Sequence, residues 1–260
     1  MTKTSGTKQW AYKNLNIYYG CSNNCSYCYA RRMAKRFDRI EKDEDWKCMV
    51  PNEKNIQKNY QKLKNPTDLY DYMFPTSHDI SPESVDNYCI VLKKLLKAGN
   101  TVLITTKANF DCIDKVYDKV LRKEDHDPNE YLKQVQFRIT IGSMFNGTLK
   151  KYEPNAPTFM NRLATLSMLT GLGFKTSVSI EPFLDKDPLP LIDLLSEHVN
   201  KEMGTIWLGI MSGQVPYELK ENYTKENIIE IITKIRQLPV EIRSKIRLKD
   251  SITNMGFNIN

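Results

Sequence analysis

The sequence predicts an α/β fold, a partial (β/α)6 TIM-type barrel with parallel strands. Short apolar runs alternate along the chain with stretches of helical periodicity, which is typical of strand–helix units in a parallel sheet. Six such units fit into about 225 residues at the usual size of a βα repeat. A closed barrel of eight units needs roughly 250 residues before insertions, so this 260-residue chain suits a barrel that is open on one side.

The expected strands are short apolar or β-branched runs, at residues 15–20, 72–75, 101–106, 135–141, 175–180 and 206–211, with a short closing strand at 246–249. The expected helices follow them, at residues 29–42, 82–98, 110–122, 157–170, 189–199 and 225–238. Ser81 and Pro82 predict the start of the second helix, and Gly99 predicts its end. We therefore expect a single domain over residues 1–260, with a barrel core at about 15–250.

Two segments interrupt this alternation. The stretch 43–71 is polar and rich in Lys and Asn, which predicts an insertion with one short helix at 54–63. The stretch 126–130 is acidic and contains Pro128, which predicts a linker.

Three cysteines lie in one short loop, at residues 20–29, between the first strand and its helix. Cys21, Cys25 and Cys28 have the spacing C-x3-C-x2-C. Thiolates spaced in this way can hold three corners of a cubane iron–sulfur cluster and leave the fourth iron open to a ligand. A zinc site is the alternative, but zinc needs four ligands, and no second Cys or His pair has zinc-finger spacing. A disulfide framework is not expected, because residues 1–9 lack the apolar segment of a secretory signal.

The cysteine loop and its strand–loop–helix setting resemble those of the radical S-adenosylmethionine (SAM) superfamily. Within it, the chain is most similar to the spore photoproduct lyase-related (DNA repair photolyase-like) group. The shared motifs are spread over residues 15 to about 185, about two-thirds of the chain. They are the tyrosines on either side of the last loop cysteine, the TSxD-like loop at 76–79, the TTK sequence at 105–107 and the EPxAPxxxxRL segment at 153–163.

The resemblance implies a [4Fe–4S] cluster on the three cysteines and SAM as the ligand of the open iron. One electron from the cluster would cleave SAM to methionine and a 5′-deoxyadenosyl radical. Tyr27 would contact SAM near its adenine, and Lys107 and Thr140 would contact its amino-acid or ribose part. Tyr29 lies where the lyase has a tyrosine implicated in hydrogen transfer. An electron donor such as flavodoxin or ferredoxin is the implied partner.

Two charged residues near the fifth strand are further candidates for cofactor binding. Arg162 can pair with Glu153 or with a ligand carboxylate. Glu181 ends the strand at 175–180 and can meet a ribose or a substrate group. The alternatives are a structural Glu–Arg pair and a solvated loop acid.

The loop after the second strand departs from the lyase pattern. Thr76 stands where the lyase has a hydrogen-donating cysteine, and a threonine O–H bond is too strong to donate a hydrogen atom to a carbon radical. Thymine-dimer repair by that mechanism is therefore not expected. His78 and Asp79 in this loop are candidates for acid–base catalysis or substrate binding, with helix capping as the alternative.

The basic charge is concentrated near the cysteine loop. Residues 1–64 contain 14 Lys/Arg and 6 Asp/Glu, for a charge of +8, whereas residues 65–260 contain 24 and 25, for −1. Arg31, Lys35, Arg39 and Lys42 would share one face of helix 29–42. A nucleic acid is therefore one expected substrate. A small molecule or peptide is the alternative, and a non-enzymatic metal-binding module is a third hypothesis.

The expected compartment is the cytoplasm. No window approaches the roughly 18 consecutive apolar residues of a membrane span.

Overall fold

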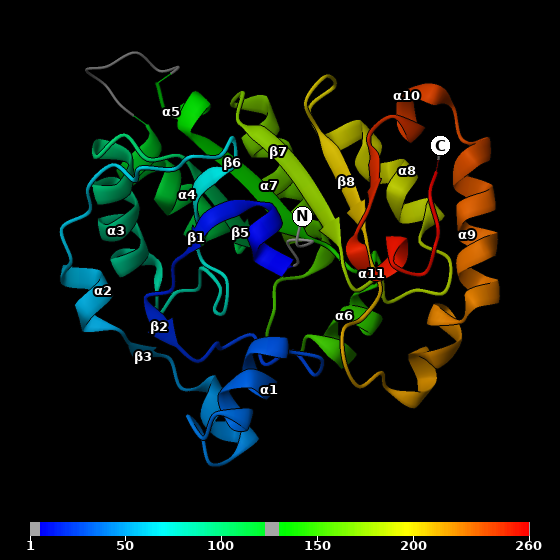
Figure 1. Cartoon of the computed structure of the whole chain (residues 1–260), viewed down its shortest axis with the longest axis horizontal. Helices are drawn as coiled ribbons and strands as arrows, with labels where there is room; N and C mark the ends of the chain where they lie inside the picture. Colours follow the sequence, from blue (N-terminus) through cyan, green and yellow to red (C-terminus); the bar gives the residue numbers. More distant parts are fainter. Residues whose placement is uncertain (1–5, 123–129, 260) are drawn as a thin grey trace.

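Seven parallel strands form the centre of the computed structural model, which describes residues 6–122 and 130–259 (Figure 1). The strands are β1 Ala11–Asn14, β4 Tyr70–Met73, β5 Val102–Thr106, β6 Val135–Thr140, β7 Lys175–Ile180, β8 Thr205–Leu208 and β9 Ile246–Leu248. They lie side by side in this order, and every neighbouring pair is parallel. Within the described residues β1 and β9 are the edges and do not pair, so the predicted partial barrel is confirmed.

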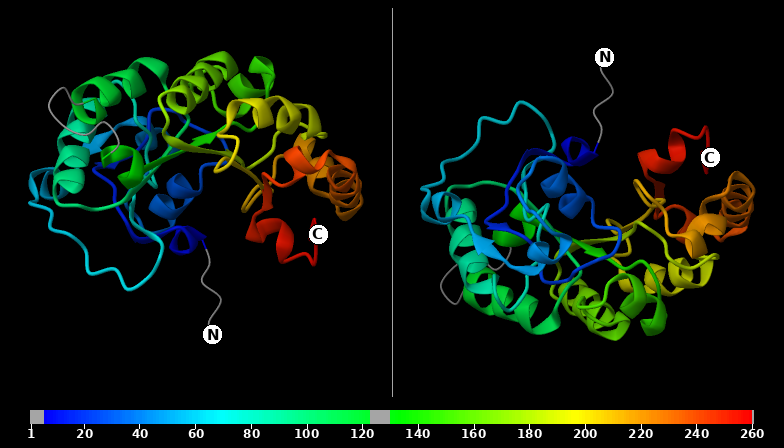
Figure 2. Two further views of the ribbon diagram at one scale, coloured as in Figure 1. Left: turned by 90° about the horizontal axis from the view of Figure 1, so that it is seen from above. Right: turned by 90° about the horizontal axis from the view of Figure 1, so that it is seen from below.

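Helices cover the outer side of the curved sheet (Figure 2). The outer helices are α3 Val85–Lys97, α4 Phe110–Val116, α7 Phe159–Gly171, α8 Leu189–His198 and α9 Lys225–Gln237. Shorter helices are α1 Tyr29–Arg36, α2 Glu53–Gln57, α5 Glu130–Gln134, α6 Asn146–Tyr152, α10 Val240–Arg243 and α11 Asp250–Thr253. The 3-10 helices are η1 Gly6–Gln9, η2 Asp43–Lys47 and η4 Tyr217–Tyr223, and η3 Tyr117–Leu121 is a π-helix.

The two faces of the sheet differ in polarity, as strand β6 shows. Val135, Phe137 and Ile139 are buried in the apolar layer beneath the helices, and Phe137 contacts Phe174 after α7. The alternate positions Gln136, Arg138 and Thr140 face the barrel interior. The interior of this barrel is therefore a polar surface on which ligand-binding groups can be displayed.

The first strand begins earlier than predicted. The barrel strand is β1, whereas the expected strand at 15–20 contains only β2 Tyr18–Tyr19, which pairs in antiparallel fashion with β3 Val50–Pro51. Leu15 and Ile17 are buried in the core without belonging to a barrel strand. The Leu15 amide donates to the carbonyl of Met73 at the end of β4, and the Ile17 amide donates to His78 Nε2 in the loop that follows. Burial of these residues outside a barrel strand therefore produces the same apolar run in the sequence as a strand does.

Helix boundaries also differ from the prediction. The expected helix at 29–42 ends at Arg36, because Phe37 caps it and Asp38 has a φ of 50°. The expected helix at 54–63 is the shorter α2, and the helix α6 within 142–156 was not predicted. The expected linker at 126–130 lies, apart from its last residue, outside the described residues.

No helix in the described parts of the chain has both the length and the apolar character needed to cross a membrane.

Candidate active site

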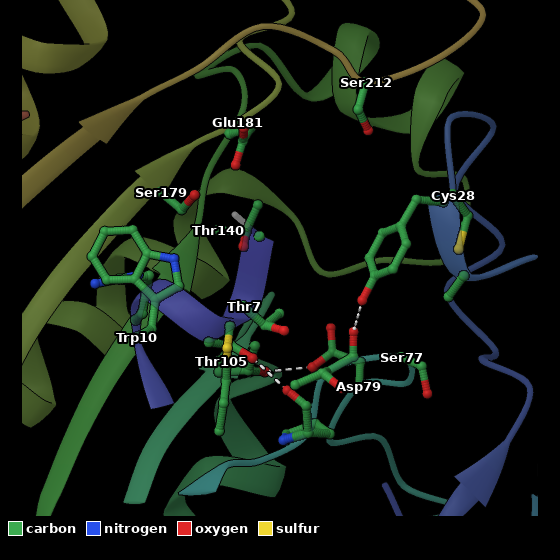
Figure 3. A pocket seen from close by; sticks show the side chains of 18 of the residues that line it. Thr7, Trp10, Cys28, Ser77, Asp79, Thr105, Thr140, Ser179, Glu181 and Ser212 are labelled. Atoms are coloured by element: carbon green, nitrogen blue, oxygen red, sulfur yellow. Dashed lines mark hydrogen bonds between the residues drawn. The ribbon is translucent and has the colours of Figure 1, made fainter. Parts of the chain in front are cut away.

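One cavity of about 1010 Å³ lies at the C-terminal ends of the strands (Figure 3). Its walls come from the N-terminal segment, the cysteine loop, the ends of β4 to β7 and the residues after β9. Cys28 and Trp10 lie on opposite sides of the cavity, with Thr140 and Glu181 between them. Active sites of barrel enzymes form at this end of the strands, because the loops there are free to vary.

The three loop cysteines face this cavity together. Gly20 precedes them with a φ of 92°, and a Cβ at this position would lie 2.3 Å from the Cys48 carbonyl oxygen. The Cys21 amide donates to the Trp46 carbonyl at 2.8 Å, and Cys28 caps α1. The segment after α1 therefore packs on the loop and fixes its shape.

The chemistry of this donor set fits an iron–sulfur cluster. All three cysteines are free thiols, and soft thiolates select iron–sulfur clusters or zinc. Among the described residues no three His, Cys, Asp or Glu side chains converge as ligands of a single metal ion. In a cubane cluster each thiolate binds a different iron, so the three cysteines do not need to converge on one point. Burial, with a smaller contribution from Asp79, raises the pKa of the Cys21 thiol to about 12, so a bound metal must displace its proton.

A buried ionic network lies next to Cys25. Glu153 pairs with Arg162 Nη2 at 2.5 Å and with Lys107 Nζ at 3.1 Å, and the Tyr27 hydroxyl donates to its Oε1. Burial opposes ionisation of Glu153, but the charges of Lys107 and Arg162 outweigh it and lower the pKa of Glu153 to about 2. The network therefore fixes two predicted ligand-binding groups, Tyr27 and Lys107, at the cavity wall.

Arg162 lies behind this wall, outside the cavity. Its Nε donates to the Pro157 carbonyl at 2.9 Å, and its Nη1 donates to the Thr140 carbonyl at 3.0 Å. With Nη2 on Glu153, every guanidinium nitrogen has a partner within the protein. The structure thus shows the Glu–Arg pair, which also holds the backbone of Thr140.

Asp79 joins three segments of the site. Its carboxylate accepts hydrogen bonds from Asn23 Nδ2 at 2.7 Å, from Thr106 Oγ1 at 2.5 Å, and from the amides of Ile80 and Lys107 at 2.7 and 3.0 Å. The cysteine loop, the end of β5 and the loop after β4 therefore share one buried acceptor.

Both nitrogens of the His78 ring are bound to the backbone. Nε2 accepts from the Ile17 amide at 3.1 Å, so Nδ1 carries the proton and donates to the Asp79 carbonyl at 3.0 Å. Burial lowers the pKa of His78 to about 4, so the ring is neutral at neutral pH.

Tyr29 and Thr76 come together at the mouth of the cavity. The Tyr29 hydroxyl donates to the Thr76 carbonyl, and the Thr76 side chain accepts from Asn16 Nδ2 at 2.8 Å. Burial, with a smaller contribution from Cys28, raises the pKa of Tyr29 to about 12, so this phenol keeps its proton at neutral pH.

Glu181 lies at the cavity wall and is paired within the protein. Lys249 Nζ lies 2.7 Å from its Oε2, and the Ser251 hydroxyl donates to its Oε1 at 3.3 Å. A Cβ on Gly209 would lie 2.7 Å from Glu181 Oε1, so Gly209 makes room for this side chain.

The cavity residues that were not predicted from the sequence include Trp10, Arg138 and Lys249. A lone arginine in the apolar run 135–141 and a lysine after the last strand were the available signals. Neither signal distinguishes the barrel interior from the solvent-exposed surface.

Comparisons with known proteins support the fold. No family model matches the chain. An uncharacterized protein of Methanocaldococcus jannaschii is 30% identical over 173 residues, which are 65% of this chain and 60% of that relative. Several solved structures of spore photoproduct lyase align with this chain. The form complexed with dinucleoside spore photoproduct has a TM-score of 0.58 and 13% identity, over 94% of this chain and 78% of the lyase chain.

A mutant of the lyase with bound AdoMet and dinucleoside spore photoproduct has a TM-score of 0.55 and 14% identity, over 85% of this chain and 63% of that one. At these identities the likeness shows the fold. The chain therefore has the partial-barrel fold seen in spore photoproduct lyase, as its alternation of strands and helices predicts.

Proposed function

We propose that this protein is a radical SAM enzyme. The observation that carries the proposal is that Cys21, Cys25 and Cys28 face one cavity together with Lys107 and Thr140. A reduced [4Fe–4S] cluster, when bound, supplies the electron that cleaves SAM to methionine and a 5′-deoxyadenosyl radical. An electron donor such as flavodoxin or ferredoxin would reduce it.

The residues of this chain have separate tasks in the proposed enzyme. Tyr27 and Lys107, held by Glu153, form the wall that receives SAM, and the Thr140 hydroxyl contributes a hydrogen-bonding group. Arg162 supports this wall from behind. Glu181 lines the same cavity and would give SAM a further polar contact.

Among the candidate catalytic groups, Tyr29 is half exposed at the cavity mouth and its hydroxyl makes one hydrogen bond, to the Thr76 carbonyl, whereas His78 and Asp79 are buried. The polar atoms of His78 and Asp79 are engaged by neighbouring protein groups. We therefore assign Tyr29 to hydrogen transfer, and His78 and Asp79 to positioning the loops.

The metal content tests the cluster. Anaerobic reconstitution should give about four iron and four sulfide per chain, as the cubane requires. Cys28→Ala should lose most of this iron, whereas Cys48→Ser should keep it, because Cys48 is exposed and outside the cavity lining. Zinc bound without sulfide would refute the proposal and favour a non-enzymatic metal-binding module.

A nucleic-acid substrate is favoured by one surface feature near the site. Phe37 at the end of α1 is 55% exposed, and the guanidinium carbons of Arg36 and Arg39 lie 6.0 and 5.6 Å from its ring centroid. An exposed aromatic ring beside cations is a stacking platform for single-stranded nucleic acid. The solved lyase that shares this fold holds a dinucleoside.

Binding of a labelled single-stranded oligonucleotide, measured by anisotropy over a salt series, tests this substrate class. Phe37→Ala should weaken binding about tenfold, and Arg36→Gln with Arg39→Gln should lower the salt slope by about two. The control is Lys225→Gln, an exposed charge at the start of α9. A wild-type affinity that does not change with salt concentration would instead favour a small-molecule or peptide substrate. The same conclusion would follow if Phe37→Ala bound the oligonucleotide as tightly as the wild type.

A further inference from the structure

Arg138 is a charged side chain inside the barrel that the proposed radical chemistry does not use. It lies on β6, is 5% exposed and lines the cavity. Its guanidinium carbon is 4.0 Å from the ring centroid of Trp10 and 5.2 Å from that of Trp207. Its Nε donates to Ser177 Oγ at 3.2 Å, whereas its Nη1 has no hydrogen-bond partner among residues 6–122 and 130–259.

The protein holds this guanidinium in place through a chain of polar contacts. The Tyr70 hydroxyl donates to Gln136 Oε1 at 2.5 Å, and Gln136 Nε2 donates to Ser177 Oγ at 3.0 Å. Ser177 in turn accepts from Arg138. A buried donor without a partner is destabilising, and apolar packing would avoid this. A native protein that keeps such a donor points to a partner from outside the chain.

The nearby carboxylates have other partners. Glu181 is paired with Lys249 at 2.7 Å, and Asp250 accepts from Gln9 Nε2. No carboxylate among the described residues lies within ion-pair distance of Arg138. Burial lowers the pKa of Arg138 to about 10, so it keeps its positive charge at neutral pH. Lys249 Nζ, 5.8 Å from the ring centroid of Trp10, adds a second cation to this end of the cavity.

We propose that Arg138 binds an anionic oxygen group of the substrate, a carboxylate or a phosphate, with Trp10 as the apolar wall beside it. Guanidinium groups bind such oxygens through two parallel N–H bonds. This inference rests on the proposed function, because it assigns the substrate to the Trp10 side of the cavity, across from the Cys28 side (Figure 3). An anchored anionic end directs the rest of the substrate toward the cysteine loop.

Tryptophan fluorescence of the full chain tests this site, because two of its three tryptophans contact the guanidinium. Inorganic phosphate and acetate, each titrated at constant ionic strength, serve as the test anions. We expect a saturable change with one or both. A stronger response to phosphate identifies a phosphorylated substrate, and a stronger response to acetate identifies a carboxylate.

Two variants shift the expected result in opposite directions. Arg138→Met should weaken anion binding about tenfold or more. Glu181→Gln should strengthen anion binding about fivefold, because the substitution removes a negative charge from the same cavity. Misfolding would weaken binding, so it cannot account for a gain. Lys186→Met, an exposed lysine, should bind as the wild type does. The absence of a saturable response to both anions, or equal binding by Arg138→Met and wild type, would overturn the inference.

SAM cleavage separates the inference from the proposed function. Arg138→Met should still form 5′-deoxyadenosine from SAM, because Arg138 serves the substrate. Loss of SAM cleavage in a folded Arg138→Met protein would assign the guanidinium to SAM and overturn the inference. Anion binding by a wild-type protein that cleaves no SAM would overturn the proposed function and leave the anion site supported.

Discussion

Replacing Glu153 with glutamine should lower the free energy of unfolding by about 3 to 5 kcal/mol. The substitution keeps the shape of the side chain but removes the only carboxylate that pairs with both Lys107 and Arg162 among the described residues. Glu153 and Arg162 are fully buried, so their charges are poorly compensated by water. Denaturant unfolding of the full chain at neutral pH measures the loss.

The matched control is Glu218→Gln, which breaks an exposed ion pair with Lys151 and should change the unfolding free energy little. A Glu153→Gln protein as stable as the control would contradict the role of the network.

The same carboxylate makes stability depend on pH. The pKa of Glu153 is about 2 in the folded protein and is higher in the unfolded chain. The contribution of Glu153 to the free energy of unfolding is therefore fully present above the pKa of the unfolded chain. It is lost as the pH falls through about 2. Glu153→Gln should lack this part of the acid dependence.

Replacing Asp79 with asparagine should lower the free energy of unfolding by about 2 to 3 kcal/mol. An amide has one acceptor oxygen, so its NH2 group must face at least one backbone N–H donor, that of Lys107 or that of Ile80. Because Asn23 belongs to the cysteine loop, the variant should also retain less iron after reconstitution. Denaturant unfolding and iron content measure the two effects.

Asp86→Asn is the control for this change, because Asp86 is an exposed carboxylate paired with Lys115. Wild-type stability and iron retention in Asp79→Asn would show that Asp79 does not hold the loops together.

The fold could be predicted because the strand pattern of a parallel sheet is local. Strand β7 was predicted at the residues it occupies, and β5 and β6 within one residue, because their apolar runs end at Gly, Lys or Pro residues. The first strand was misplaced, because Leu15 and Ile17 are buried against β4 and the loop after it, which are distant in sequence. Such burial leaves the same apolar pattern as a strand.

The site could be predicted in part for a similar reason. The three cysteines form one local motif and Lys107 ends a predicted strand, so each could be recognised from its own stretch of sequence. The parallel sheet then brings both to one cavity at the strand ends. Arg138 and Trp10 meet only through the curvature of the sheet and the path of the N-terminal segment. No local pattern encodes that contact.

The most direct test of the central claim is 5′-deoxyadenosine formation from SAM by the anaerobically reconstituted and reduced full chain. The proposal predicts product for the wild type and for Cys48→Ser, and only background for Cys25→Ala. A wild-type protein that holds its cluster but forms no 5′-deoxyadenosine, with an oligonucleotide and a small anionic compound present as substrates, would contradict the account. Product formation that persists in Cys25→Ala would contradict it equally.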